Sequence, residues 1–456
     1  MIFGSSSLLF NNRKKLDHCS AAYAWFVVLM LWSLCFLNYA DRQILSSVFP
    51  ILEQQFHFTK FQLGMIGSIF MWVYGASVFF TGYLSDRFKK KPLILLGCLF
   101  WSIVAMATGC CSSFLQFFLV RGLEGLGESF YFPASHAFIA MIHQKRNRSK
   151  ALGVHQSGVY LGTVAGSWGG AYLAQHYGWS SGFYFFGGLG VLLSLIFYFF
   201  LREPSEHLVP QQELPPSLEA VAFSSELHSS HATSPKSLGE VFIYLLRQPS
   251  IRLIVLAFIC ANFVATIFLT WLPTFLFEKF HFQLSLAAFY SVAFIQITSA
   301  LTIPLFGTVA DYLSLFMKNA RLMVQVVSLL LGTIAIFIIG NATTTFSLFL
   351  SMIFFGACKA GYDNGIFASL FDYIEPSLRG TASGLMIALG WSGGALGPLL
   401  VGAIATYGGE KSSAIARMSL TIGASSLAYL LGALLLILTF LMKRKEFSLL
   451  SENRLS

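Results

Sequence analysis

The stretch Asn38-Tyr39-Ala40-Asp41-Arg42 places a carboxylate beside a guanidinium inside an otherwise apolar run. Mostly apolar residues occupy 24–37 before it and 44–52 after it, so the run is long enough to cross a bilayer as a helix. An ionised side chain near the bilayer centre costs about 2.5 to 3.5 kcal/mol on insertion scales, and such residues usually face a bundle interior or a water-filled cavity. The stretch predicts a transport site; the alternative is a static ion pair that holds helices together.

Composition places the rest of the chain in a membrane as well. Of the 456 residues, 56% are hydrophobic and 11% are charged, well beyond the usual balance of a soluble domain. The formal charge of +9 does not indicate nucleic-acid binding, because in a membrane protein the location of the basic residues matters more. The seven cysteines have no metal-ligand spacing, and we expect them to pack as small apolar residues. We expect no metal, no cofactor and no nucleic-acid partner.

Segments of about 20 apolar residues predict twelve membrane-spanning helices. Helices are expected because lipid offers backbone groups no hydrogen-bond partners. The fold class is therefore an all-α membrane protein. The predicted spans are 23–50, 62–84, 92–112, 114–142, 150–175, 180–201, 251–277, 285–312, 322–341, 345–372, 380–406 and 414–442.

The distribution of Lys and Arg predicts the orientation. With the N-terminus inside, the cytoplasmic segments hold 22 basic residues and the external loops hold 4, namely Lys60, Lys279, Lys411 and Arg417. Positively charged loops stay on the cytoplasmic side. We expect both termini in the cytoplasm of a cell membrane, with a bacterial inner membrane as the setting, and a monomeric protein.

A polar stretch divides the chain in two. Residues 203–249 are rich in Glu, Pro, Ser and His, as expected of a linker, and Ser237-Leu-Gly-Glu240 resembles the capping box of a short interfacial helix. We predict a cytoplasmic N-terminal segment (1–22), an N-terminal six-helix bundle (23–201), a cytoplasmic linker with that helix (202–250), a C-terminal six-helix bundle (251–442) and a cytoplasmic tail (443–456).

The two halves repeat each other. One short correspondence, at an offset of 225 residues, pairs Gly82 and Asp86 with Gly307 and Asp311. Six plus six parallel repeats predict a pseudo-two-fold axis and a substrate site near the midplane, between the halves. The main correspondence, at an offset of 231, pairs Gly125 with Gly356, Tyr131 with Tyr362, Arg148 with Arg379, Ala151 with Ala382, Gly153 with Gly384, Gly162 with Gly393 and Gly166 with Gly397.

The loop Gly82-Tyr-Leu-Ser-Asp86-Arg87 and its second copy, which runs from Gly307 to Asp311, resemble the signature of the major facilitator superfamily. Arg121-Gly-Leu-Glu-Gly125 resembles another of its motifs. The resemblance covers both halves and implies two bundles that rock around a central site. The aspartates can cap helix ends and pair with basic residues across the cytoplasmic face, so we expect Gly82, Asp86, Arg87, Gly307 and Asp311 to form a cytoplasmic gate.

Two branches of that superfamily share further motifs with the chain. The stretch from Asn38 to Arg42, with Gly125-Leu-Gly127-Glu128 and Tyr131, resembles the spinster-like transporters of lysolipids and sphingoid phosphates. The same opening, with Phe132-Pro133-Ala134 and Trp271-Leu-Pro273, is similar to organic-anion symporters of sugar acids. We favour the spinster-like branch and keep sugar acids or other small carboxylates as the alternative.

Charged residues within the spans complete the predicted site. Arg121, Glu124 and Glu128 follow each other at spacings of three and four, so one helical face carries all three. Glu128 lies 14 residues into its span, about 21 Å along the helix and near the midplane, and so does its repeat mate Lys359. We expect Asp41 and Glu128 to carry protons. The expected substrate-binding residues are Arg42, Asn38, Tyr39, Arg121, Tyr131, Lys359, Tyr362 and Asp363, with Tyr74, Tyr160, Asn262, Gln296 and Trp391 as weaker candidates.

These features together predict a secondary transporter of an organic anion, for example a lysophospholipid-like amphiphile. We expect protons to drive the transport. No phosphate-binding loop, nucleophile elbow or metal triad occurs in the sequence, so we expect neither ATP-driven transport nor an enzyme. A receptor or scaffold on a transporter fold is the alternative from another class. Such a protein would not need a nearly balanced charge cluster at the midplane.

Overall fold

The computed structural model describes residues 21–203, 243–245, 247–317, 319–374, 378–408 and 413–452, with the backbone only over 443–452. Most of the predicted segment 1–22 and most of the linker 202–250 with its interfacial helix fall outside the described residues, whereas the last helix continues to residue 452 of the predicted tail 443–456. Every regular element within the described ranges is a helix, which confirms the all-α class.

The helices of the first half follow the predicted spans closely. The first predicted span is α2 with the short α3, and the fourth is broken into α6 and α7. The bounds are α2 (Ala21–Ser47), α3 (Phe49–Phe56), α4 (Lys60–Arg87), α5 (Lys90–Thr108), α6 (Phe114–Glu128), α7 (Tyr131–Ile142), α8 (Lys145–Tyr177) and α9 (Ser181–Phe200).

The second half repeats this pattern with more interruptions. Its last three spans each consist of two helices in line. The bounds are α12 (Pro249–Phe280), α13 (Leu284–Ser314), α14 (Ala320–Asn341), α15 (Thr345–Asp363), α16 (Ile366–Phe371), α17 (Arg379–Gly394), α18 (Leu396–Tyr407), α19 (Ala414–Ala424) and α20 (Ser426–Glu452).

The predicted count of twelve spans is confirmed. Ten helical segments of the described chain are long and apolar enough to cross a membrane by length and composition alone. The remaining two predicted spans are α6–α7, interrupted at Ser129 and Phe130, and α8, whose first turns carry a cluster of basic residues. Charged and polar residues, rather than a missing helix, distinguish these two spans from the other ten.

The duplication predicted from the sequence recurs in the packing. Gly125 of α6 lies so close to α4 that a β-carbon would meet the carbonyl oxygen of Phe70 at 2.5 Å. Its repeat mate Gly356 of α15 meets α13 in the same way, at 2.7 Å from the carbonyl oxygen of Ile295. Ser113 and Thr344, also 231 residues apart, both cap the helices that follow them. Equivalent residues therefore build equivalent helix contacts in both halves.

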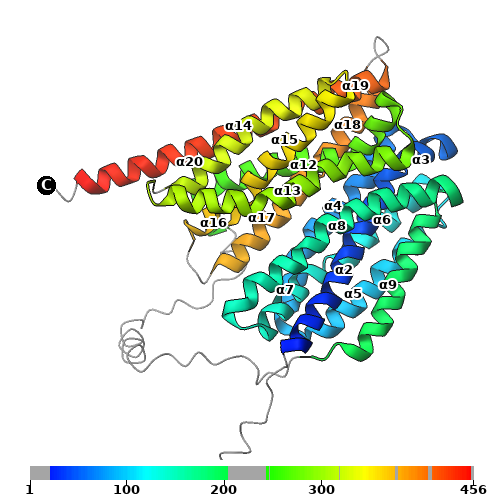
Figure 1. Ribbon diagram of the computed structural model, residues 1–456, viewed down its shortest axis with the longest axis horizontal. Helices are drawn as coiled ribbons and strands as arrows, with labels where there is room; N and C mark the ends of the chain where they lie inside the picture. The colour runs from blue at the N-terminus through cyan, green and yellow to red at the C-terminus, as the bar shows by residue number, and fades with distance from the viewer. Residues whose placement is uncertain are drawn as a thin grey trace, which may run out of the picture.

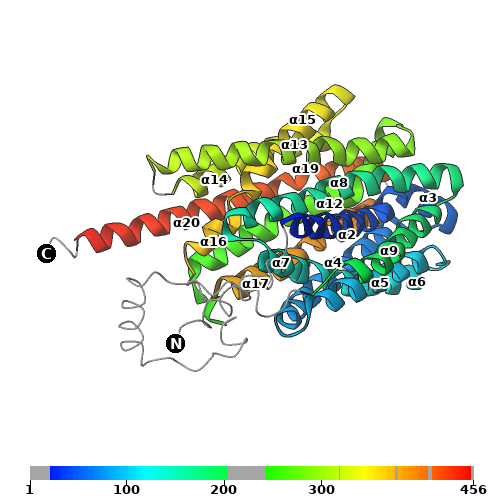
Figure 2. The same ribbon diagram turned by 60° about the horizontal axis from the view of Figure 1, so that its bottom comes forward.

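The two halves lie as separate groups of helices that meet along the middle of the molecule (Figure 1). Helix α8 of the first half runs beside α13 of the second in both views (Figures 1 and 2), and α4 packs against α17 and α18. We call the end at which α9 ends and α12 begins the linker face, and the other end the opposite face. Arg42 of α2 and Trp391 of α17 meet between these faces, where the halves touch.

Candidate substrate-binding site

Arg42 of α2 forms an ion pair with Glu128, the last residue of α6. Its Nε donates to Glu128 Oε2, and the two side chains are 9% and 0% exposed. Glu128 lies where α6 ends, just before the interruption at Ser129 and Phe130. The sequence predicted both residues for the site, but it placed Arg42 beside Asp41 rather than against α6.

Aromatic rings surround the Arg42 guanidinium. Its central carbon lies 4.6 Å from the ring centre of Tyr39, 4.5 Å from that of Tyr74 and 5.1 Å from that of Phe70. The ring of Trp391, which belongs to α17 of the other half, lies 5.6 Å away. Ring faces attract a desolvated cation. The cage therefore holds the guanidinium in place at the junction of the halves and leaves its hydrogen-bonding edge for other partners.

Two donors of Arg42 remain available in this cage. The nitrogens Nη1 and Nη2 are buried and have no hydrogen-bond partner in the described chain. Arg42 lines a cavity of about 60 Å³ together with Arg121, Gln43 and Trp391. A guanidinium binds carboxylate or phosphate through two parallel hydrogen bonds. The cavity thus offers positive charge and unused donors to a bound anion.

Arg121 brings a second cation to the same cavity. Its Nη1 donates to Glu124 at 2.6 Å within α6, and both side chains are buried. Its guanidinium also lies 4.9 Å from the Phe70 ring centre. The shared helical face predicted for Arg121, Glu124 and Glu128 is thus present, although Arg121 and Glu128 pair with different partners.

Asp41 and Asn38 lie behind the cavity in the first half. Asp41 is 1% exposed and Asn38 is 0% exposed. Neither side chain has a hydrogen-bond partner within normal distance in the described chain, although the indole nitrogen of Trp101 is near enough to Asp41 to act on its carboxylate. Burying a carboxylate without a partner is costly when it is ionised. This geometry fits a carboxyl group that gains and loses a proton.

The predicted residues of the second half form a neighbouring site. Lys359 pairs with Asp363 one turn further along α15. Lys359 also lines a small cavity with Gln296 and Phe268, and Leu269 borders both this cavity and the one at Arg42. The Lys359–Asp363 pair of the second half and the Arg42–Glu128 pair of the first half therefore lie near two cavities that share Leu269 of α12.

Four of the predicted binding residues do not line these cavities, namely Asn38, Asp363, Tyr131 and Tyr362. The Tyr131 hydroxyl donates to the Leu31 carbonyl oxygen and contacts His155 Nε2 at 2.8 Å. Tyr362 is 1% exposed and packs in the apolar core of the second half. The placement of the two tyrosines favours a packing role in this conformation.

The predicted gate residues lie at the linker face, but the two stretches expected as loops are the last turns of α4 and α13. Arg87 ends α4 and lies over the Tyr83 ring at 4.3 Å, whereas the Asp86 side chain lies outside the described part of the structure. Asp311 approaches Arg321 of its own half at 3.6 Å, and both are exposed. The one gate aspartate that can be described therefore makes its ion pair within its half.

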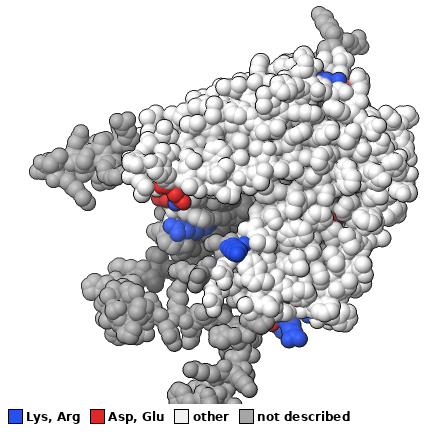
Figure 3. All heavy atoms as spheres, in the orientation of Figure 1, with Lys and Arg blue, Asp and Glu red and all other residues white. Residues whose placement is uncertain are grey.

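The linker face is open in this structure. A β-carbon added at Gly82, Gly153 or Gly384 would meet no atom within 4 Å, although Gly153 and Gly384 are repeat mates on helices that border the junction. The surface is hollowed between the halves toward this face, with basic side chains beside the hollow (Figure 3).

The opposite face is closed by contacts that join the halves. Lys60 at the start of α4 donates to Glu278 of α12 at 2.5 Å and to Glu53 of α3 at 2.7 Å. The backbone nitrogen of Phe61 donates to the Thr406 hydroxyl at 3.0 Å. The sequence counted Lys60 only as an external base, because residues of three separate helices make the cluster.

Two repeated six-helix bundles around a charged central cavity define the fold of a membrane transporter. The model of the Major Facilitator Superfamily matches residues 31–398, and the chain belongs to this superfamily. The relatives and solved structures that match this chain are transporters and not enzymes, as the sequence predicted.

Sequence relatives and solved structures agree with this assignment. A rice protein named probable anion transporter 4, chloroplastic, is 27% identical over 85% of this chain, which spans 65% of that relative's length. The probable galactarate/D-glucarate transporter GudP of Bacillus subtilis is 26% identical over 91% of both chains. Bovine protein spinster homolog 1 is 27% identical over 58% of this chain and 48% of its own.

The crystal structure of a bacterial homolog of the human lysosomal transporter Spinster, in an inward-facing and unoccupied conformation, shares the fold. Its TM-score is 0.75 at 20% identity, over 92% of this chain and 97% of that one. Both branches that the sequence motifs indicated are therefore represented among the matches.

Proposed function

We propose that this chain is a secondary active transporter that moves an organic anion across the membrane by alternating access. The observation that carries the proposal is the pair of buried, unpartnered nitrogens of Arg42 beside a cavity lined from both halves. Arg121 adds a second positive charge there. Donors held in place before binding lose little freedom when an anion docks.

Proton coupling follows from the partners of Arg42. An anion that docks at Nη1 and Nη2 shares the guanidinium charge with Glu128, and a buried carboxylate whose counter-charge is partly neutralised is stabilised by taking up a proton. Asp41 sits close by without a partner and provides a second proton-binding group. Anion and proton would then enter and leave together, as in a symporter.

The positive-inside rule supports the orientation. With 22 basic residues on the linker side and 4 on the other, the linker face and both termini lie in the cytoplasm, and the structure represents an inward-open state. The bundles 23–201 and 251–442 would be the moving bodies, in a monomer of a cell membrane. Lys60 with Glu53 and Glu278 would form the external gate.

The substrate that we favour is an amphipathic anion of the lysophospholipid type. The aromatic cage around Arg42 and the spinster relatives support this choice. A sugar acid or another small carboxylate is the second candidate. It is favoured by the small central cavity, about 60 Å³, and by the GudP relative.

Uptake into proteoliposomes tests the proposed function. With an imposed pH gradient, we expect labelled anion to accumulate above its equilibrium distribution, and an ionophore that collapses the gradient should abolish the accumulation. Binding of the anion without any flux, in vesicles with intact protein in both orientations, would instead indicate a receptor or scaffold.

A further inference from the structure

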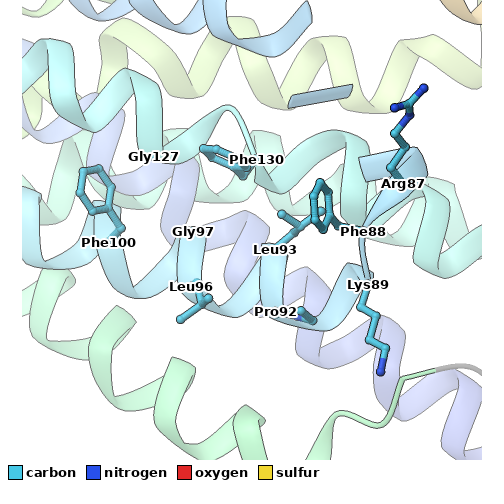
Figure 4. A pocket seen from close by; sticks show the side chains of 10 residues that line it. All are labelled: Arg87, Phe88, Lys89, Pro92, Leu93, Leu96, Gly97, Phe100, Gly127 and Phe130. Carbon is cyan, nitrogen blue, oxygen red and sulfur yellow. The ribbon is translucent and has the colours of Figure 1, made fainter. Parts of the chain in front are cut away.

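A large pocket lies away from the central site, on the outer side of the first half. Its volume is about 680 Å³, within the range of small-molecule sites, and it is formed by the end of α4, by α5 and by the junction of α6 and α7. Figure 4 shows Arg87 and Lys89 at one end of this pocket and Phe100 at the other. The transport mechanism proposed above makes no use of it.

Glycines create the space. A β-carbon at Gly127 would meet the Phe100 ring at 2.5 Å, and one at Gly97 would meet Phe130 at 3.3 Å. Leu96 is 64% exposed and Phe100 is 42% exposed, as expected of side chains that face lipid rather than protein. The pocket is therefore an apolar groove on the membrane surface of the bundle.

The dimensions of the groove match one leaflet. Helix α5 begins at Lys90 on the linker face, and Phe100 lies ten residues further along. Ten residues rise about 15 Å, which is half of the roughly 30 Å hydrocarbon core of a bilayer. An acyl chain along the groove would place its polar end at the level of Arg87 and Lys89.

The basic residues at one end of the groove indicate which polar group its ligand carries. Arg87 and Lys89 are exposed, and no carboxylate pairs with either one among the side chains that the structure describes. The nearby carboxylate of Glu203 accepts from the backbone nitrogens of Lys90 and Lys91, both at 2.8 Å. Cations beside an apolar groove attract anionic lipid headgroups, and phosphate oxygens form strong hydrogen bonds with them.

We propose that this groove binds an anionic phospholipid of the leaflet at the linker face, with one acyl chain along α5 and the phosphate at Arg87 and Lys89. The site differs from the central cavity in its residues and in its access, which is from the membrane. It does not depend on the identity of the transported substrate.

Thermal unfolding of the full chain in neutral detergent tests this site. Phosphatidylglycerol should raise the melting temperature by several degrees more than phosphatidylcholine with the same acyl chains, because it binds the folded state more tightly. The double variant Arg87→Gln/Lys89→Gln should weaken the apparent affinity for phosphatidylglycerol at least tenfold. The control Lys150→Gln/Arg202→Gln removes two exposed charges of the same half outside the groove and should respond like wild type.

Two further arms separate the alternatives. Glycerol phosphate without acyl chains should not stabilise the protein, and equal stabilisation by it would remove the groove from the interaction. The Arg42→Lys variant should keep the full preference for phosphatidylglycerol, and loss of that preference would place the lipid in the central cavity. An equal response to both lipids, or equal losses in the two double variants, would overturn the proposal.

Discussion

Arg42 pairs with Glu128, which is 86 residues away along the chain, and not with Asp41 beside it. Two consequences follow. The carboxyl group of Asp41 is buried without a partner, and the Arg42 guanidinium ties α2 to the end of α6 through one nitrogen only. The two acids expected to carry protons therefore differ sharply in what their neutralisation does to the folded state.

We predict opposite stability effects for Asp41→Asn and Glu128→Gln. Glu128→Gln leaves a buried guanidinium without its counter-ion, which costs about 3 to 5 kcal/mol of unfolding free energy. Asp41→Asn breaks no hydrogen bond or ion pair of the described chain and should leave stability unchanged or raise it. Denaturant unfolding in detergent measures both values.

Transport by the same two variants completes this test. Both variants should be recovered from the membrane fraction as folded protein. Both should lose the pH-driven accumulation of the anion, because each lacks a proton-binding group. Full accumulation by both neutral variants would remove Asp41 and Glu128 from the coupling mechanism.

We predict that Lys60→Gln opens the opposite face. The contact of Lys60 with Glu278 joins the two halves and exists only while that face is closed, and losing it costs the closed state about 1 to 3 kcal/mol. Labelling of Ser46→Cys by an impermeant reagent from that side should increase at least fivefold. Lys279→Gln is the matched control, since Lys279 bonds to Gly340 and Ser419 of its own half; equal labelling of the two variants would contradict the gate.

Large side chains in place of Gly153 and Gly384 should hold the linker face open. A β-carbon at Gly153 or Gly384 meets no atom within 4 Å in the present state, so the melting temperatures of Gly153→Leu and Gly384→Leu should stay within a few degrees of wild type while transport is lost. Gly166→Leu is the contrast, because its β-carbon would meet the carbonyl oxygen of Ala40 at 2.2 Å and should prevent folding. Normal transport by both open-face variants would show that these helices do not approach each other.

We predict that Asp86→Asn shifts the protein toward the state that is open at the linker face. A charge-assisted contact made only on closure of that face is worth about 1 to 3 kcal/mol. Labelling of Gly384→Cys from the linker side should rise accordingly. Asp311→Asn is the control, because its exposed ion pair with Arg321 contributes little; labelling that is unchanged by Asp86→Asn would show that Asp86 is only a solvated residue at the end of α4.

The sequence predicted the twelve spans, the duplication and the charged cluster well. Spans follow from apolar length, and the repeat is carried by glycines such as Gly125 and Gly356, whose spacing along the chain is fixed by close helix contacts. The helical face shared by Arg121 and Glu124 is also a local property, since a turn of helix brings these residues together.

The partners of the charged residues could not be predicted in the same way. The pair of Arg42 and Glu128 depends on how α2 and α6 pack, and the cluster around Lys60 joins three helices. Trp391 reaches Arg42 from the other half. Sequence spacing contains no information on such contacts, because they depend on the arrangement of whole helices in one conformation.

The central claim is that Arg42 binds the anionic group of the substrate. Thermal unfolding of wild type and Arg42→Lys, titrated with lysolipid phosphates, hexuronates and neutral sugars, tests it most directly. We expect one anionic class alone, lysolipid phosphates by preference, to raise the melting temperature of wild type. Arg42→Lys should unfold at a similar temperature without ligand and bind the anion at least tenfold more weakly, because Lys cannot form two parallel hydrogen bonds to it. Stabilisation by neutral sugars, with Arg42→Lys behaving as wild type, would contradict the account.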